Sequence, residues 1–229
     1  MSEAVESAFA APAPDSRRGL LWTGAAPVEA GKVRLGVGTG GGWLATFSGL
    51  QVAGGGAEVD GAWAITERVA WTATAGAGVG WLRQEGPVRG FGGVSGLRVL
   101  LVDAERIRFA TFAAGAGAPG LGMVGGGVAI ELPVYAVCFD LALPLGGVVV
   151  AGTLPDAIPL TSGPFAPLFL LGEAGFTWRL GDHTSFRLGY VALATSWSWR
   201  WQDDRFTLEV SGYTNGLTGN ASVRGGVVF

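Results

Sequence analysis

The sequence is poor in the residues that build disulfides, metal centres and histidine-based active sites. Its 229 residues include one cysteine, Cys138, and one histidine, His183. A single cysteine excludes an intrachain disulfide, and the two residues together are too few for a Cys/His metal cluster. His183 lies in the motif GDHT, which is typical of a solvated turn, so a histidine-based hydrolytic site is disfavoured. We therefore expect no metal, no cofactor and no enzymatic activity.

Charge is also scarce, and neither sign is in large excess. Charged residues make up 14% of the chain, against about a quarter in ordinary soluble domains, while hydrophobic residues make up 49%. The net charge is −3, so the chain lacks the basic surface of a nucleic-acid-binding protein. This composition favours contact with a lipid bilayer and predicts no nucleic-acid partner.

Long hydrophobic runs of the kind that form membrane-spanning helices are missing. The best uncharged window, residues 111–130, contains eight glycines or prolines. A helix there loses about 1 kcal/mol for each glycine and about 3 kcal/mol for the proline relative to alanine. The sequence therefore disfavours a helical span and leaves spanning strands, whose signature is alternation.

Glycine and period-two alternation are what the sequence has in abundance. Glycine accounts for 41 residues, and the stretch VAWTATAGAGVGW, residues 69–81, places apolar residues at every odd position and small ones between them. A strand running the roughly ten residues from Trp71 to Trp81, tilted by about 40°, rises about 25 Å. That rise matches the apolar band of a membrane barrel, so we expect the two indole rings to mark its two interfaces.

The same alternation recurs along the chain and predicts ten strands. They are residues 32–39, 57–65, 69–81, 91–101, 107–115, 124–132, 135–143, 168–180, 185–193 and 217–229. The expected fold is all-β: an up-and-down antiparallel transmembrane β-barrel of about ten strands, within a range of eight to twelve. The barrel is expected to occupy residues 29–229 and to follow a flexible Ala/Pro-rich segment, residues 1–28.

Two stretches complicate the strand assignment. Trp197, Trp199 and Trp201 are interpreted as an extension of the ninth strand beyond the membrane, with residues 205–210 pairing back against it. The boundary between the sixth and seventh strands is placed near residues 132–133, and a turn at residues 144–147 is the rival.

The links between the strands differ in length and predict two unlike rims. The short polar links are residues 66–68, 103–105 and 181–183, and the longer glycine-rich ones are residues 40–54, 83–90, 116–122, 152–164 and 199–216. An even number of strands then places both termini on the rim of short turns.

Charged residues fall on one face of the predicted strands, and large apolar residues fall on the other. We expect these charges to line the lumen: Lys32, Arg34, Glu58, Asp60, Arg98, Arg108, Glu131, Asp140, Glu173, Arg179, Arg187 and Arg224. We expect these aromatic residues at the membrane interfaces: Trp63, Trp71, Trp81, Phe109, Phe176, Trp178 and Phe229. A soluble barrel has the opposite orientation; the scarcity of charge favours the membrane arrangement, and a soluble β-barrel binding protein is the alternative.

Over about residues 22–229 the chain resembles the bacterial outer-membrane β-barrel superfamily. The resemblance is carried by the closing stretch SVRGGVVF, which ends in Phe229, and by TGAAPVEAGKVRLGVG, which leads into the first strand. It implies a barrel in the outer membrane of a Gram-negative bacterium, with the barrel-assembly machinery as a partner that reads the C-terminal strand. The first residues, MSEAVESAFAAPAPDSRR, do not show the basic and apolar regions of a secretory leader.

The lumen charges predict what the barrel does. If they pair with one another they fill the lumen, and the protein acts as a structural or binding barrel through its extracellular loops. If some are unpaired, the slight excess of basic groups lines a narrow channel for small anionic or amphipathic solutes. The first function is preferred because about ten strands leave little free bore.

Overall fold

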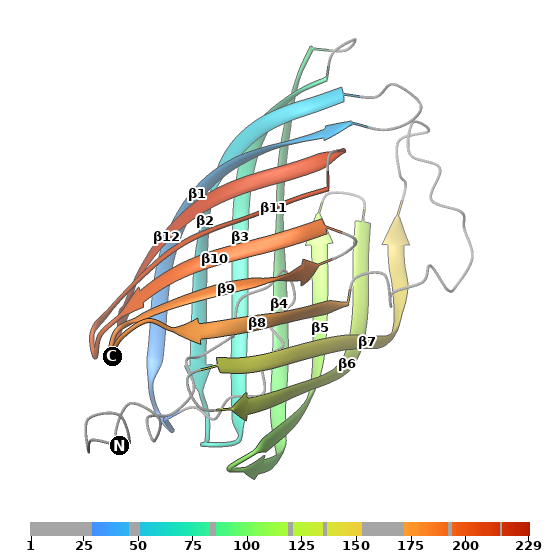
Figure 1. Ribbon diagram of the computed structural model, residues 1–229. Coiled ribbons are helices and arrows are strands. Elements are labelled where there is room, and N and C mark those ends of the chain that lie inside the picture. Colours follow the sequence, from blue (N-terminus) through green and yellow to red (C-terminus); the bar gives the residue numbers. More distant parts are fainter. Residues whose placement is uncertain are drawn as a thin grey trace.

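The computed structural model describes residues 29–45, 51–82, 86–118, 121–134, 137–152, 172–191, 194–215 and 217–229. These residues form twelve strands: β1 (Val33–Ala45), β2 (Gln51–Ala64), β3 (Val69–Leu82), β4 (Gly86–Ala104), β5 (Ile107–Ala118), β6 (Leu121–Val134), β7 (Val137–Gly152), β8 (Glu173–Arg179), β9 (Thr184–Val191), β10 (Ala194–Gln202), β11 (Phe206–Thr214) and β12 (Thr218–Val228). Each strand pairs with its neighbours in the chain, and β1 pairs with β12 to close the barrel (Figure 1). The predicted N-terminal segment, residues 1–28, lies outside the described residues.

Within the described ranges, no helix is long and apolar enough to cross a membrane.

The predicted all-β antiparallel barrel is confirmed, and its strand number is at the upper end of the predicted range. The two additional strands are β10 and β11. The predicted pairing of residues 205–210 against the stretch of Trp197, Trp199 and Trp201 is confirmed, but this stretch is a separate strand of the barrel and not an extension of the ninth strand, and most of the predicted link at residues 199–216 is strand. The two strands form a separate hairpin, with Trp199 opposite Val210 and Trp201 opposite Leu208. Only residues 203–205 separate them, and so short a turn leaves little signal in the sequence.

The other uncertain boundary is resolved near its predicted place. Strand β6 ends at Val134 and β7 begins at Val137, so the rival turn at residues 144–147 is wrong. Those residues continue β7, where Pro144 lies opposite Gly127 at a register shift. Such an irregularity accommodates a proline, which has no N–H to give to the ladder.

The start of β1 and the end of β12 lie at one rim, which we call the terminal rim, as expected for an even number of strands. Phe229 and Val33 exchange backbone hydrogen bonds of 2.8 and 3.1 Å at the closing seam. The turns at residues 65–68, 105–106, 180–183 and 203–205 lie on the same rim (Figure 1). At the opposite rim, which we call the distal rim, strands β1–β6 extend well into the glycine-rich stretches predicted as long links, so these links are shorter than expected.

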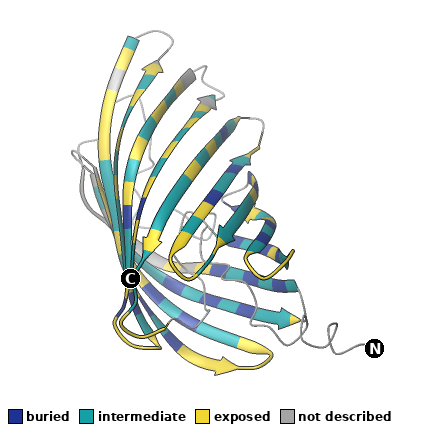
Figure 2. Cartoon of the chain, turned by 90° about the vertical axis from the view of Figure 1, so that its left-hand side faces the viewer, coloured by how far each residue is buried: buried dark blue, intermediate teal, exposed yellow. Residues whose placement is uncertain are grey.

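Burial is inverted relative to a soluble protein (Figure 2). The outward positions of the strands carry exposed apolar residues, such as Val37 at 64% and Phe91 at 68%. The inward positions carry buried ionic groups, such as Glu131 at 1% and Arg98 at 4%. Period-two alternation produces this result directly, since successive side chains point to opposite faces of a strand.

Asp203 holds the β10–β11 turn at the terminal rim. Its Oδ1 accepts hydrogen bonds from the backbone N–H groups of Phe206, at 2.6 Å, and Arg205, at 2.8 Å. These bonds, that from Phe206 most of all, hold the pKa of Asp203 below its usual range. Only the ionised carboxylate accepts both bonds well, so their contribution to the stability of the turn is complete above the ordinary pKa of an aspartate. This stabilisation is lost as the pH falls through the lower pKa that Asp203 has in the folded chain.

We therefore expect Asp203→Ala to reduce the hydrogen-exchange protection of the Arg205 and Phe206 amides about tenfold. In the unaltered protein, the same loss is expected only below about pH 4. Asp204→Ala, which alters the exposed neighbour, is the control and is expected to change neither amide. Equal protection in the Asp203 and Asp204 variants would contradict this role.

Candidate functional site in the lumen

The structure places the predicted lumen charges on the inner face and brings most of them into ion pairs. Arg34 pairs with Asp60, and Arg224 with Glu58. Arg108 contacts Asp103 at 3.2 Å and Glu131 at 3.7 Å, and Arg187 contacts Asp140 and Glu173. Two further pairs are Arg179 with Asp182 at 3.8 Å and Lys32 with Glu29 at 3.7 Å. Arg98 is buried on β4. The pairs of Arg179 and Lys32 involve exposed partners close to the terminal rim, so they lie outside the buried part of the lumen.

The most buried ionic contacts surround Arg187 on β9. Its Nη2 lies 2.6 Å from Oδ2 of Asp140 on β7 and 2.6 Å from Oε1 of Glu173 on β8. Its Nη1 also donates to the hydroxyl of Ser196 at 3.4 Å. All three ionic side chains are nearly inaccessible to solvent, so each depends on the others for compensation of its charge.

A glycine makes the contact between β7 and β9 possible. Gly175 on β8 lies between Asp140 and the strand that carries Arg187. A Cβ atom at this position would be 2.7 Å from Nη2 and 2.8 Å from Cζ of Arg187. The arginine therefore crosses β8 over a position that has no side chain.

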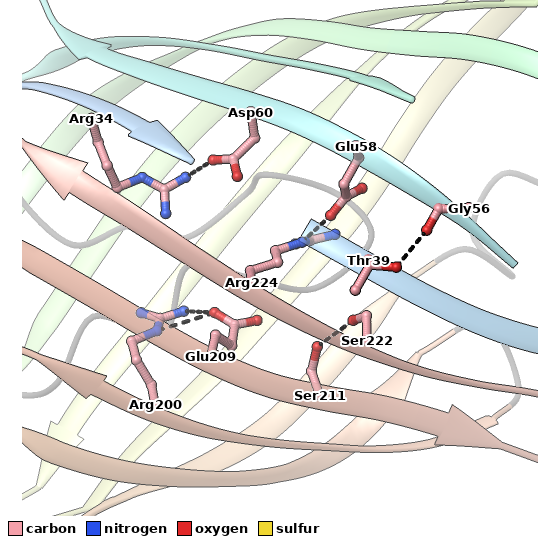
Figure 3. Close-up of polar contacts among 10 residues, drawn as sticks. All are labelled: Arg34, Thr39, Gly56, Glu58, Asp60, Arg200, Glu209, Ser211, Ser222 and Arg224. Atoms are coloured by element: carbon pink, nitrogen blue, oxygen red, sulfur yellow. Dashed lines mark hydrogen bonds and ion pairs between the residues drawn. The ribbon is translucent and has the colours of Figure 1, made fainter. Parts of the chain in front are cut away.

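A second set of charges forms a row across the closing seam, and we call it the charge belt: Arg200, Glu209, Arg224 and Glu58 (Figure 3). Signs alternate along this row, and Arg200 donates to Oε2 of Glu209 through Nε at 3.2 Å and Nη2 at 2.9 Å. Arg224 on β12 reaches Glu58 on β2 by crossing Gly38 on β1. The charge belt therefore joins four strands around the seam.

Sequence reasoning missed two members of the charge belt, Arg200 and Glu209. They lie on β10 and β11, which were not predicted as strands of the barrel. The alternation WSWRW was visible, and with β10 assigned as a strand it places Arg200 on the inner face. Glu209 in FTLEV follows in the same way.

One row nearer the distal rim, the inner face carries no charged residue from β10 across the seam to β4, and Arg187 on β9 lies beside the end of this row, opposite Ser198. We call this row the serine–glycine belt, and the strand registers align its members across seven neighbouring strands: Ser198, Ser211, Ser222, Gly40, Gly56, Gly78 and Gly90. The next row contains Ser196, Tyr213 and Asn220, followed by Gly42, Gly54 and Gly80. Hydroxyl and amide groups thus occupy β10–β12 in both rows, whereas glycines occupy β1–β3 in both rows and β4 in the first.

The lumen is hollow beside these uncharged rows. A cavity of about 550 Å³ is lined by the glycines of β1–β4 together with Glu58, Asn220, Ser222 and Arg224. A second cavity of about 300 Å³ shares those four residues and is also lined by Ser198, Ser211 and Tyr213. The shared lining makes the two cavities neighbouring parts of one luminal space.

The predicted interface aromatics lie on the outer face. Trp63, Trp71, Trp81, Phe176 and Phe229 are exposed, and Phe109 and Trp178 are half-buried. Trp63 lies opposite Trp71 near the terminal rim, whereas Trp81 is the last residue but one of β3, near the distal rim. The indole N–H of Trp71 donates to the Ser95 hydroxyl at 3.0 Å. Phe176, Trp178 and Phe186 form a run of ring contacts with centroids 6.1 to 6.2 Å apart.

His183 and Cys138 do not line the two lumen cavities. His183 lies in the β8–β9 turn at the terminal rim, with Nδ1 3.0 Å from the carbonyl oxygen of Gln202. Cys138 is buried on β7, and its Sγ contacts the carbonyl oxygen of Phe139 at 3.7 Å. In the described part of the chain, no three His, Cys, Asp or Glu residues are grouped so that they could hold a metal.

Comparison with known proteins gives likeness in structure but not in sequence. No family model matches the chain, and no curated protein matches it. The structure is similar to that of the KdgM porin, with a TM-score of 0.55 and 6% identity over 85% of this chain and 99% of that one. A structure of the KdgM porin in complex with disordered oligogalacturonate gives the same TM-score at 7% identity, over 85% of this chain and 99% of that one. The translocator domain of the autotransporter NalP from Neisseria meningitidis gives a TM-score of 0.45 at 13% identity, over 99% of this chain and 92% of that one.

The similarity to the KdgM porin agrees with the inverted burial of the strands. An apolar outer face suits a lipid environment, and the closed antiparallel barrel is the architecture by which strands cross a membrane. Both observations fit a barrel that spans a membrane, as expected from the sequence. The chain has the porin-like fold of the bacterial outer-membrane β-barrels.

Proposed function

We propose that the protein is an outer-membrane barrel whose lumen is closed to steady ion flow near the terminal rim and hollow toward the distal rim, and that it acts as a binding or structural barrel. The observation that carries this proposal is the pairing of the buried charges. The charge belt lies one row nearer the terminal rim than the serine–glycine belt, and the charged residues that line the cavities, Glu58, Arg224 and Arg187, are held in ion pairs. Paired ions attract one another strongly where water is scarce, and such pairs hold neighbouring strands together.

Membrane insertion follows from the same proposal. Strand β12 supplies the outward residues Val223 and Val227 and is followed by Phe229, all of them exposed. We propose that the barrel-assembly machinery reads this C-terminal strand before it pairs with β1. The distal rim then faces the exterior of the cell, so a solute or a partner meets the hollow half of the lumen first.

Conductance across a planar lipid bilayer tests the closed lumen. We expect the unaltered protein to give no steady conductance steps in 1 M KCl. A double variant, Glu58→Ala with Arg224→Ala, removes both members of one ion pair and leaves no unpaired charge in its place. It is expected to open a measurable conductance, whereas Lys32→Ala at the exposed rim is expected to leave the barrel closed.

The second candidate function is a narrow channel for small anionic or amphipathic solutes. It is favoured by the slight excess of basic residues among the lumen charges predicted from the sequence and by the similarity in fold to the KdgM porin. A steady, anion-selective conductance in the unaltered protein, lost on Arg98→Glu or Arg108→Glu, would establish the channel and reject the closed lumen.

A further inference from the structure

We infer that the hollow half of the lumen binds a small, uncharged, hydroxyl-rich solute, with the serine–glycine belt as its binding surface. This inference rests on the proposed function only in taking the cavity to be reached from the distal rim. The combination of hydroxyl groups, bare backbone and neutralised charge at one level of the barrel is what identifies the solute class.

The first step concerns the polar groups that face the cavities. The lining side chains of β10–β12 are Ser198, Ser211, Tyr213, Asn220 and Ser222. All five are half-buried, and the Ser211 and Ser222 hydroxyls are 3.1 Å apart. Hydroxyl and amide groups both donate and accept hydrogen bonds. This wall can therefore bind the hydroxyl groups of a solute both as donors and as acceptors.

The second step concerns charge. Arg224 and Glu58 are the charged residues that line both cavities, and they are paired with each other. Arg187, which lines the smaller cavity, is held by Asp140 and Glu173. An anionic solute would have to displace one of these carboxylates, and a cationic solute one of these guanidinium groups. A neutral solute needs neither exchange, so the cavity favours it.

The third step concerns shape. On β1–β4 the lining of the larger cavity is mostly glycine, so the backbone itself forms much of the surface beside the hydroxyl groups. The larger cavity, about 550 Å³, falls within the range of small-molecule sites in proteins. A ring with apolar faces and polar edges fits such a space, because its face can lie on the glycines while its edges meet Ser222 and Asn220.

Gly90 offers a way to fill the cavity without disturbing the sheet. It lies on the serine–glycine belt and lines the larger cavity, and a Cβ atom added there has nothing within 4 Å. Gly90→Leu therefore places an apolar side chain in the binding space. Ala75→Leu adds a similar side chain at an exposed, outward position of the adjacent strand and serves as the matched control.

The test is calorimetric titration of the full chain in lauryldimethylamine oxide micelles, a detergent without a sugar headgroup. The probes are three disaccharides of similar size: neutral maltose, anionic lactobionate and the cationic glucosamine dimer. We expect saturable binding of maltose, binding of both charged disaccharides at least about tenfold weaker, and a loss of about tenfold or more in maltose affinity in Gly90→Leu but not in Ala75→Leu. Heat-modifiable migration of both variants on gels verifies that each is folded.

Several results would overturn the inference. They are equal or tighter binding of a charged disaccharide, no saturable binding of any of the three, or unchanged maltose affinity in a folded Gly90→Leu variant. Bilayer conductance remains an independent measurement. A steady conductance rejects the closed lumen but leaves the preference for a neutral solute to be decided by the titrations.

Discussion

Replacing Arg187 with methionine is expected to lower the free energy of unfolding of the barrel by about 3–5 kcal/mol, because it leaves two buried carboxylates without a partner. Both oxygen atoms that Arg187 contacts at 2.6 Å belong to side chains with almost no solvent access. Asp140 and Glu173 lie on different strands, so their repulsion acts between β7 and β8. Urea unfolding in lipid vesicles, followed by tryptophan fluorescence and by heat-modifiable migration, measures the change.

Two further variants separate the effect of charge from a general loss of packing. Asp182→Asn disrupts the 3.8 Å contact with Arg179, in which Asp182 is 92% exposed, and is expected to change the free energy by less than about 0.5 kcal/mol. A triple variant, Arg187→Met with Asp140→Asn and Glu173→Gln, removes all three charges and is expected to recover most of the lost stability. If the triple variant is no more stable than Arg187→Met alone, the ionic explanation is wrong.

The outward and inward faces of most strands could be predicted from the sequence because alternation is a local property. VAWTATAGAGVGW and IRFATFAAG each show which residues face lipid, whatever strand lies beside them. The pairing of β10 with β11 was predicted, but a local feature hid the fact that they are separate strands of the barrel. Both strands are nine residues long, and they are joined by a turn with neither glycine nor proline.

Which inner residues meet could not be predicted, because partnership depends on register between strands far apart in the chain. Arg224 and Glu58 are separated by 166 positions, and Arg187 and Asp140 by 47. The serine–glycine belt is a further consequence of register. Ser198 and Gly90 share a row only because six successive strand pairings align them, and nothing in either local sequence indicates it.

A common arrangement underlies the two ion pairs that cross a strand. In each case an acidic residue, a glycine and an arginine lie on three successive strands around the barrel: Asp140, Gly175 and Arg187 in one, and Glu58, Gly38 and Arg224 in the other. A side chain at the glycine would fill the space that the arginine crosses. The glycines beside the charges therefore serve ion pairing, which differs from the role of the glycines that line the cavity.

The glycines of the serine–glycine belt are themselves of two kinds, and Gly56→Ala is expected to show the difference by destabilising the barrel by about 3 kcal/mol. A Cβ atom at Gly56 would be 2.5 Å from the carbonyl oxygen of Ala77 and 3.0 Å from Cα of Gly78, both in the backbone of β3. Backbone atoms cannot turn aside as a side chain does, so β2 and β3 must separate and weaken their hydrogen bonds. The close approach of these strands, rather than the space in the lumen, requires glycine at this position.

Gly90→Ala is the matched control, because it adds the same methyl group in the same row where no atom lies within 4 Å. We expect its stability to equal that of the unaltered barrel or to exceed it by about 0.5 kcal/mol, since alanine restricts the unfolded chain more than glycine does. Urea midpoints in lipid vesicles compare the two variants directly. Equal destabilisation by both would mean that flexibility of the glycine backbone, and not strand contact, sets the requirement. A neutral Gly56→Ala would mean that β2 and β3 can move apart freely, and the cavity between the glycine wall and the hydroxyl groups of β10–β12 would then have no fixed width.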